Sequence, residues 1–299
     1  MTDLSESSKG VLFGLAAYTL WGSFPLYFAL FEGIPAFEVL IHRIVWSSVF
    51  LAVVISALRR WSPVKAALRQ PTRLGYVLGC ALLIGLNWFV YIYAVESRQV
   101  LQASLGYFLT PLVNVALGLI ILRETISRWQ SFAVILAVVA ILYQLVQLGV
   151  MPWISLILAF SFGTYGLMRK KVKLDGLSGL FVETLLLLPM GLFAWSVLSA
   201  QDLSSFSQTP YATLLLMSAG AATAIPLLFF AGAARRLRLA TVGFLMYINP
   251  TLQFLIALLV FAEPLSTDKL ISFVIIWIAL AIYSWSAWSG RNHLEKQVT

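Results

Sequence analysis

The chain has little charge, one cysteine and two histidines. Only 11% of its 299 residues are charged, against about 25% in an average soluble domain, so a soluble fold is excluded. The lone cysteine, Cys80, rules out an intrachain disulfide, and we expect it to be a small packing residue inside an apolar run. Two histidines are too few for a histidine-rich metal site. We therefore expect no metal and no cofactor.

Recognisable catalytic motifs are missing as well. The sequence contains no His-Glu-x-x-His, no Gly-x-Ser-x-Gly and no cluster of Asp or His. This absence predicts that the protein is not an enzyme. The formal net charge of +8 would suggest nucleic acid as a partner of a soluble protein. Here the basic residues lie in short loops between apolar runs, so membrane topology explains them and no nucleic acid is expected.

Long apolar runs dominate what is present. The chain is 61% hydrophobic, and a helix of about 20 apolar residues crosses the hydrocarbon core of a bilayer. The pattern predicts an all-α integral membrane protein with ten transmembrane helices. The predicted spans are 10–31, 36–58, 74–95, 99–122, 128–147, 150–168, 177–199, 211–233, 238–261 and 267–289. Their short connections predict antiparallel neighbours.

The distribution of Lys and Arg predicts the orientation of these spans. With the N-terminus in the cytoplasm, 17 of the 20 basic residues fall in cytoplasmic segments. The outer loops hold two, Arg98 and Lys269, and Arg43 lies inside a span. Such a bias predicts that both termini are cytoplasmic. The N-terminal segment has no basic stretch before its apolar run, so we expect a retained helix rather than a signal peptide.

Two stretches of the sequence repeat each other 139 residues apart. Pro111, Asn114, Glu124 and Ser127 recur at one offset as Pro250, Gln253, Glu263 and Ser266. Each half, 1–148 and 149–299, contains five spans, an odd number, so the second five-helix repeat must be inverted relative to the first. Inverted repeats are typical of secondary transporters, with the substrate near the midplane. Pro111 and Pro250 are the predicted hinges, and Pro25 and Pro226 are further expected bends.

Two charged residues lie inside predicted spans. Arg43 either binds an anionic group of a substrate or pairs with a carboxylate; the structural alternative is a tie to backbone carbonyls or to Glu38. Glu183 occupies nearly the corresponding position of the second half. It is the candidate for proton coupling, with a neutral, hydrogen-bonded structural carboxyl as the alternative. A direct pair between Arg43 and Glu183 is not expected, because inversion places them at different depths.

A set of polar and aromatic residues near the middle of the spans is the candidate lining of a substrate cavity. The alternative is that the aromatic residues form interface belts or pack. With Arg43, the substrate-binding candidates are Trp21, Asn87, Trp88, Tyr91, Tyr107, Asn114, Tyr165, Tyr247 and Gln253. His42 is expected to pack. Glu124 and Glu263 are expected to fix turns, with Ser127 and Ser266 capping the helices that follow.

Several of these residues fall in motifs that together resemble a known family. The motifs are Ala17-x-x-x-Trp21-Gly22, His42-Arg43, Gly85-x-Asn87-Trp88, the run from Ala103 to Asn114, Arg123-Glu124, Tyr165-Gly166-Leu167-x-Arg169-Lys170-Lys171, Glu183-Thr184, Leu188-Pro189 and Arg236-Leu237-Arg238-Leu239. The chain resembles, nearly end to end, the RarD-type (chloramphenicol-sensitive protein) branch of the EamA-like drug/metabolite transporter superfamily.

The resemblance implies a ten-helix carrier of the bacterial inner membrane with two EamA-like repeats around a central cavity. The leading hypothesis is a secondary transporter that moves a small amphipathic metabolite, amino acid or drug by alternating access. The alternatives are a membrane-embedded enzyme, or a channel or regulatory membrane protein without carrier activity. The expected partners are a small-molecule substrate and the lipid bilayer. The sequence does not decide between a monomer and a homodimer.

Overall fold

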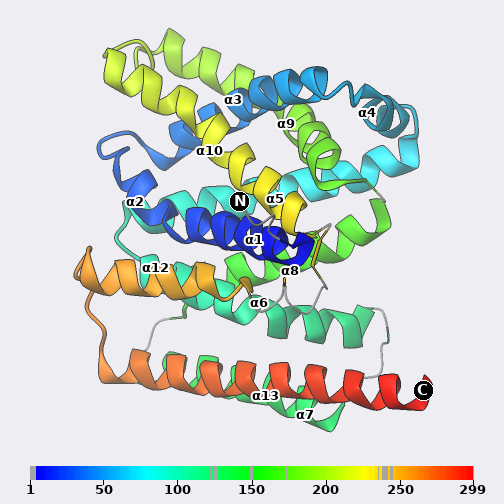
Figure 1. Cartoon of the computed structure of the whole chain (residues 1–299). Coiled ribbons are helices and arrows are strands. Elements are labelled where there is room, and N and C mark those ends of the chain that lie inside the picture. The colour runs from blue at the N-terminus through cyan, green and yellow to red at the C-terminus, as the bar shows by residue number, and fades with distance from the viewer. Residues whose placement is uncertain are drawn as a thin grey trace.

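The described part of the chain is entirely helical in its regular structure (Figure 1). A computed structural model describes residues 5–121, 123, 127–148, 151–172, 174–234, 236–237, 242 and 245–298. The helices are α1 (Glu6–Gly22), α2 (Phe24–Ala29), α3 (Ala36–Ala57), α4 (Trp61–Leu68), α5 (Pro71–Glu96), α6 (Val100–Ile121), α7 (Arg128–Leu148), α8 (Trp153–Val172), α9 (Gly176–Ala200), α10 (Pro210–Ala234), α12 (Ile248–Leu259) and α13 (Thr267–Val298). The predicted all-α fold is confirmed.

Within the described residues, helix occurs in each of the ten predicted ranges. Seven segments are long and apolar enough to cross a membrane, and α12 is a shorter apolar helix. The seven are Glu6–Ala29, Ala36–Ala57, Pro71–Glu96, Arg128–Gln147, Gly176–Ala200, Pro210–Ala233 and Thr267–Ser286. The chain is therefore a multi-pass membrane protein. Glu124 and residues 238–241 and 243–244 of the ninth predicted span lie outside the described residues.

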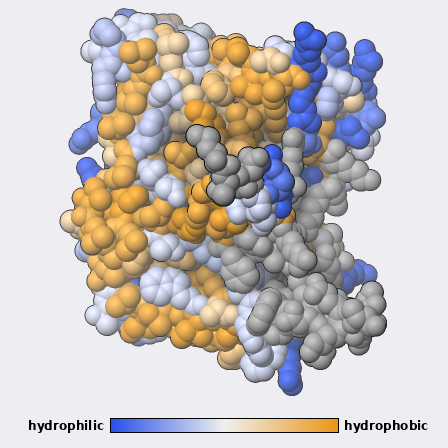
Figure 2. All heavy atoms as spheres, in the orientation of Figure 1, coloured by the Kyte–Doolittle hydropathy of each residue, from blue (hydrophilic) through white to orange (hydrophobic). Residues whose placement is uncertain are grey.

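The outer surface of the bundle is apolar, as a lipid-facing surface must be. Apolar side chains cover much of the visible face in Figure 2, and hydrophilic ones gather mainly at its margins. Val146, Phe193 and Leu214 are each more than two-thirds exposed. A soluble monomer rarely exposes such a continuous apolar surface, so this surface fits the lipid environment that the helix lengths imply.

Prolines mark several of the helix boundaries. α1 ends at Gly22, and α2 restarts with Pro25 in its first turn, so the predicted bend at Pro25 is a break between two helices. Pro111 and Pro226 lie inside α6 and α10. Pro250 instead lies in the first turn of α12, where a missing N–H costs little because that turn has unpaired donors anyway. Helix α4, which has eight residues and buries Val64 and Ala67, was not predicted from the sequence.

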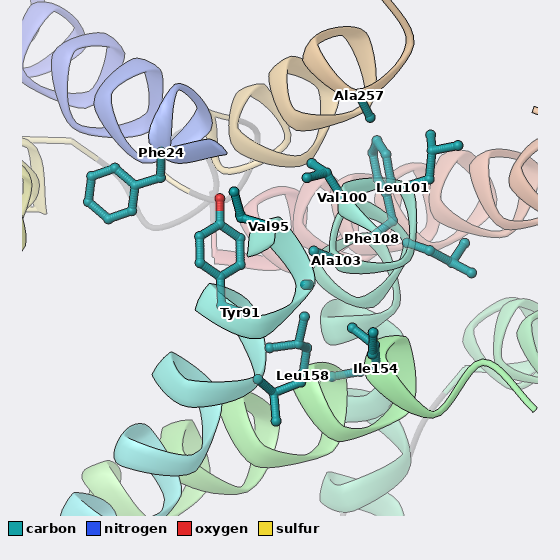
Figure 3. Close-up of a cluster of buried hydrophobic side chains, with 14 of the residues drawn as sticks. Phe24, Tyr91, Val95, Val100, Leu101, Ala103, Phe108, Ile154, Leu158 and Ala257 are labelled. Atoms are coloured by element: carbon teal, nitrogen blue, oxygen red, sulfur yellow. The ribbon is translucent and has the colours of Figure 1, made fainter. Parts of the chain in front are cut away.

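The core is built around α6. Helix α6 packs against α8 and α12, α8 also packs against α5, and α7 and α13 form a pair along one side of the bundle (Figure 1). In Figure 3, α6 presents Val100, Ala103 and Phe108 between α5, α8 and α12. Leu105, on the same helix, is 1% exposed. This packing joins the two sequence halves across a wide apolar contact.

Helix α10 approaches α3 at Gly220, and we expect this contact to be sensitive to one added methyl group. A Cβ at Gly220 would collide with the backbone carbonyl of Trp46, whereas a Cβ at Gly75 in α5 would meet nothing within 4 Å. Gly220→Ala should lower the free energy of unfolding by about 1–3 kcal/mol through overpacking. Gly75→Ala should be neutral or stabilise by about 0.5–1 kcal/mol. Thermal unfolding in detergent measures both, and equal effects would contradict the close contact.

Candidate functional site

The buried guanidinium of Arg43 is the centre of the candidate site. Arg43 lies on α3 and is 4% exposed. Its Nε donates to Thr223 Oγ1 on α10 at 2.9 Å, and the Thr223 hydroxyl in turn donates to the Ala219 carbonyl. Neither a backbone carbonyl nor Glu38 holds Arg43 in the described part of the chain, so the structural tie considered from sequence has a different partner.

Aromatic rings surround this guanidinium. Its Cζ lies 4.2 Å from the centroid of the Trp88 ring, 5.4 Å from that of Phe28 and 5.8 Å from that of Phe24. Such cation–π contacts stabilise a desolvated cation. Three tyrosine rings pack around this group: the Tyr27 and Tyr91 centroids lie 5.2 and 5.9 Å from that of Phe28, and the Tyr107 centroid lies 5.8 Å from that of Tyr91. We call Arg43, Thr223, Trp88, the two phenylalanines and these tyrosines the Arg43 cluster.

Hydrogen bonds connect the Arg43 cluster to α8 in the second half. Tyr107 donates to Asn87 Oδ1 at 3.3 Å, and Asn87 Nδ2 donates to Ser161 Oγ at 2.9 Å and to the Leu158 carbonyl at 3.1 Å. Asn87 is therefore a bridge between α5, α6 and α8. Of the predicted cavity residues, the structure brings together Arg43, Asn87, Trp88, Tyr91 and Tyr107.

A second polar centre lies around Glu183 on α9. Glu183 is fully buried and accepts from Arg169 Nη1 at 3.0 Å and from the Tyr165 hydroxyl at 3.2 Å. Gly179, one turn earlier on α9, leaves the space that the Arg169 guanidinium occupies. We call Glu183, Arg169 and Tyr165 the Glu183 cluster. Arg43 and Glu183 thus have separate partners, in agreement with the expectation that they do not pair.

The remaining predicted site residues are dispersed. Trp21 packs on Tyr18 and Phe230, with ring centroids 5.6 and 5.8 Å away. Gln253 is 1% exposed and donates to Asn249 Oδ1 at 2.6 Å, whereas its repeat partner Asn114 is exposed. Tyr247 is half-buried at the start of α12. The two repeat-related amides therefore have different surroundings.

One predicted hinge, Pro250, lies where α12 packs against α6. Ser104 on α6 donates to the Pro250 carbonyl at 2.8 Å.

His42 packs between Trp195 and Phe206 and accepts from Trp46 Nε1, as its predicted packing role requires. Ser127 and Ser266 each accept a backbone N–H of the following helix, so both predicted caps are confirmed.

Two buried carboxylates join the sequence halves at the end of the bundle that carries the α2–α3 loop. Glu38 accepts from Ser204 and Ser205, and Glu263 accepts the N–H groups of Val100 and Leu101 at the start of α6. Burial raises the pKa of the Glu263 carboxyl, and these N–H groups oppose the rise. Glu263 was predicted to fix its own turn. The correction is that it caps a helix of the other half.

Sequence reasoning missed several members of these clusters. Thr223, Phe24 and Phe28 carry no signal that marks them among many apolar-span residues. Arg169 was assigned to a basic cytoplasmic segment because it stands beside Lys170 and Lys171. The signal that could have found it is Glu183, since a buried carboxylate needs a cation or several donors.

These features define a class of protein: a polytopic helical membrane protein in whose interior polar groups of the two halves bond to each other. Residues 8–145 match the EamA-like transporter family. Protein RarD of Escherichia coli (strain K12) is 44% identical over 98% of this chain and its own full length. An uncharacterized transporter of Vibrio cholerae is 44% identical over 94% of each chain. The chain therefore belongs to the EamA-like transporter family, in its RarD-type branch.

A solved structure shows the same fold. It is 18% identical, with a TM-score of 0.57 over 93% of this chain and 97% of that chain. At this identity the likeness supports the fold alone. The family and the names of its relatives indicate a membrane transporter.

Proposed function

We propose that the protein is a secondary transporter that moves a small amphipathic metabolite, amino acid or drug by alternating access. The observation that carries this proposal is the set of buried hydrogen bonds between the halves. Arg43 bonds to Thr223, Asn87 to Ser161 and Ser104 to the Pro250 carbonyl. Polar groups inside a membrane protein are costly, and they mark substrate pathways and moving interfaces.

The packing of the helices supports an inverted repeat of residues 1–148 and 149–299. The five long helices of the first half are α1, α3, α5, α6 and α7, and those of the second are α8, α9, α10, α12 and α13. If they correspond in this order, the α5–α8 pair corresponds to the α10–α1 pair, and both pairs pack. In the same way α6 packs on α8 as α12 packs on α1. Three further pairs each join a helix to its own counterpart in the other half, and all three pack: α3–α9, α6–α12 and α7–α13. Exchange of the halves thus preserves these contacts, as a pseudo-two-fold axis requires.

Contacts at the helix ends support the predicted topology. Arg60 approaches Asp175, and Arg236 approaches Glu6, all in segments predicted to be cytoplasmic. Glu38 binds Ser205, and Glu263 binds Val100; all four lie in predicted outer loops or at the outer ends of predicted spans. The bias in Lys and Arg then favours cytoplasmic termini, and the resemblance to RarD-type carriers implies the bacterial inner membrane.

Counterflow in proteoliposomes tests the proposal. Vesicles preloaded with a panel of amino acids and amphipathic organic solutes should take up the labelled solute transiently and saturably. Protein-free vesicles are the control. Flux that rises linearly with concentration would indicate a channel, and no flux with or without a proton gradient would remove the carrier hypothesis.

Asn114 gives a variant that separates transport from folding. It is exposed and makes no hydrogen bond within the described part of the chain. Asn114→Ala should therefore change the free energy of unfolding by no more than about 0.5 kcal/mol. Counterflow should nevertheless decrease, and more strongly when Gln253→Ala is added. Unchanged counterflow in the double variant would remove both amides from the site.

A further inference from the structure

Arg43 has no anionic partner among the described residues, although it is almost completely buried. Its one hydrogen bond is from Nε to Thr223, and the ion pairs of the described residues do not include it. The four N–H donors on its Nη atoms therefore make no hydrogen bond with these residues. An uncompensated buried charge is strongly unfavourable, so this guanidinium needs an anion that the chain itself does not supply.

The acidic residue nearest in sequence is already committed elsewhere. Glu38 precedes Arg43 on α3, but its carboxylate accepts from the Ser204 hydroxyl at 2.9 Å and from the Ser205 N–H and hydroxyl at 2.6 and 2.8 Å. The rings of Trp88, Phe24 and Phe28 stabilise its charge but provide no acceptor oxygen. The Tyr27 and Tyr107 hydroxyls bond to Ser218 and Asn87 instead. The surroundings thus favour a cation and leave its fork of donors free.

A second donor without a partner lies beside this guanidinium. The Tyr91 hydroxyl is buried and makes no hydrogen bond with the described residues, and the side chains of Tyr91 and Arg43 both lie against the Phe28 ring. Figure 3 shows this hydroxyl pointing from α5 toward the end of α2 that carries Phe24, a ring that also lies over Arg43. A buried hydroxyl without a partner costs free energy. Two neighbouring donor groups without a partner among the described residues, the Arg43 Nη atoms and the Tyr91 hydroxyl, indicate a site for one acceptor group.

We propose that the Arg43 cluster is the subsite for the anionic group of the transported solute. The solute class is a small organic carboxylate with a flat or apolar body. Its carboxylate oxygens accept from the Nη atoms of Arg43 and from the Tyr91 hydroxyl, a geometry that suits the guanidinium fork. Its apolar body lies against Trp88 and Phe28. The proposal rests on alternating access, because a cluster this closed admits a solute only when the halves separate.

Ligand-dependent thermal stability of the full chain in detergent tests the subsite without requiring transport. The probes are three pairs of equal size at pH 7: phenylacetate and phenylacetamide, indole-3-acetate and indole-3-acetamide, and hexanoate and hexanamide. At least one carboxylate should raise the unfolding temperature, while its amide should not. If no carboxylate acts, or if each amide equals its carboxylate, the subsite is wrong.

Substitution of Arg43 locates the effect. Arg43→Gln should weaken carboxylate binding about 10- to 100-fold, the loss of a charge-assisted hydrogen bond. The matched control is Arg98→Gln, because Arg98 is also a cation over an aromatic ring, that of Phe261. Carboxylate binding should be unchanged in this control. Retention of full binding in Arg43→Gln would overturn the assignment.

Tyr91→Phe keeps the proposal testable if Arg43→Gln does not fold. Removal of an unpartnered buried hydroxyl should leave the ligand-free unfolding temperature unchanged or raise it. Carboxylate binding should still weaken about 2- to 10-fold, the value of one neutral hydrogen bond. A hydroxyl with only a structural role would not alter binding. Counterflow of neutral solutes alone would contradict the anion subsite but support the carrier function. Carboxylate binding without flux of any solute would support the subsite and contradict the carrier function.

Discussion

Arg169→Gln is expected to lower the free energy of unfolding by about 3–5 kcal/mol, because it leaves the buried carboxylate of Glu183 without its cation. Glu183 is 0% exposed, and Arg169 Nη1 lies 3.0 Å from its Oε1. Tyr165 donates one further hydrogen bond, which cannot replace a full charge. Thermal or denaturant unfolding in detergent measures the loss.

Two further variants distinguish a broken pair from a general packing defect. Arg169→Gln combined with Glu183→Gln removes both charges and should recover most of the stability, since two amides can hydrogen-bond to each other. Arg60→Gln is the matched control because it removes an arginine from a partly exposed pair with Asp175. That substitution should cost about 0–1 kcal/mol. Equal losses in Arg60→Gln and Arg169→Gln would contradict the argument.

The double variant also tests the proposed coupling role of Glu183. If this carboxyl carries the coupled proton, the variant should lose uptake driven by a proton gradient. Counterflow at equal pH on both sides should persist, because exchange of solute needs no net proton movement. Gradient-driven uptake that survives in the double variant would restrict Glu183 to a structural role.

The Glu183 cluster illustrates what the sequence could and could not predict. The spans follow from hydropathy, because the cost of exposing polar groups to lipid is local and additive along the chain. The pairing of Glu183 with Arg169 depends on Gly179, which leaves room for the guanidinium between α8 and α9. That space is a property of the packed helices, and the sequence shows only a glycine in an apolar run.

Arg43 shows the same limit of sequence-based prediction for partners that are far apart in the sequence. Its depth in span two predicted that it would face a partner or a cavity. Its hydrogen-bond partner, Thr223, is 180 residues away, and Trp88 approaches it from α5. A threonine in an apolar span looks like any other tolerated polar residue. Short helices are hard to predict for a related reason. Helix α4 has eight residues, too few to show a clear hydrophobic period.

Glu38→Ala is expected to open the end of the bundle that carries the α2–α3 loop. Glu38 is 1% exposed and links α3 in the first half to the α9–α10 loop in the second. Glu263 makes the reciprocal link, from the second half to α6 in the first. Each hydrogen bond to a buried carboxylate contributes about 1.5–3 kcal/mol. Loss of the Glu38 bonds should therefore shift the protein toward a state that is open at this end.

A single-cysteine reporter measures the opening. Ala219→Cys, in a Cys80→Ala background, places a thiol on α10 at a position that is 1% exposed. A membrane-impermeant maleimide should label it slowly in the parent. Adding Glu38→Ala should raise the labelling rate by about tenfold or more, which corresponds to a shift of at least about 1.4 kcal/mol in the opening equilibrium.

The control uses a carboxylate at the same end that does not join the halves. Glu96 on α5 accepts the N–H of Ala36 on α3, and both residues belong to the first half. Glu96→Ala should therefore leave the labelling rate unchanged, whereas Glu263→Ala should raise it as Glu38→Ala does. Equal acceleration by Glu96→Ala would indicate local fraying. No acceleration by either Glu38→Ala or Glu263→Ala would mean that these carboxylates hold loops in place without controlling access between the halves.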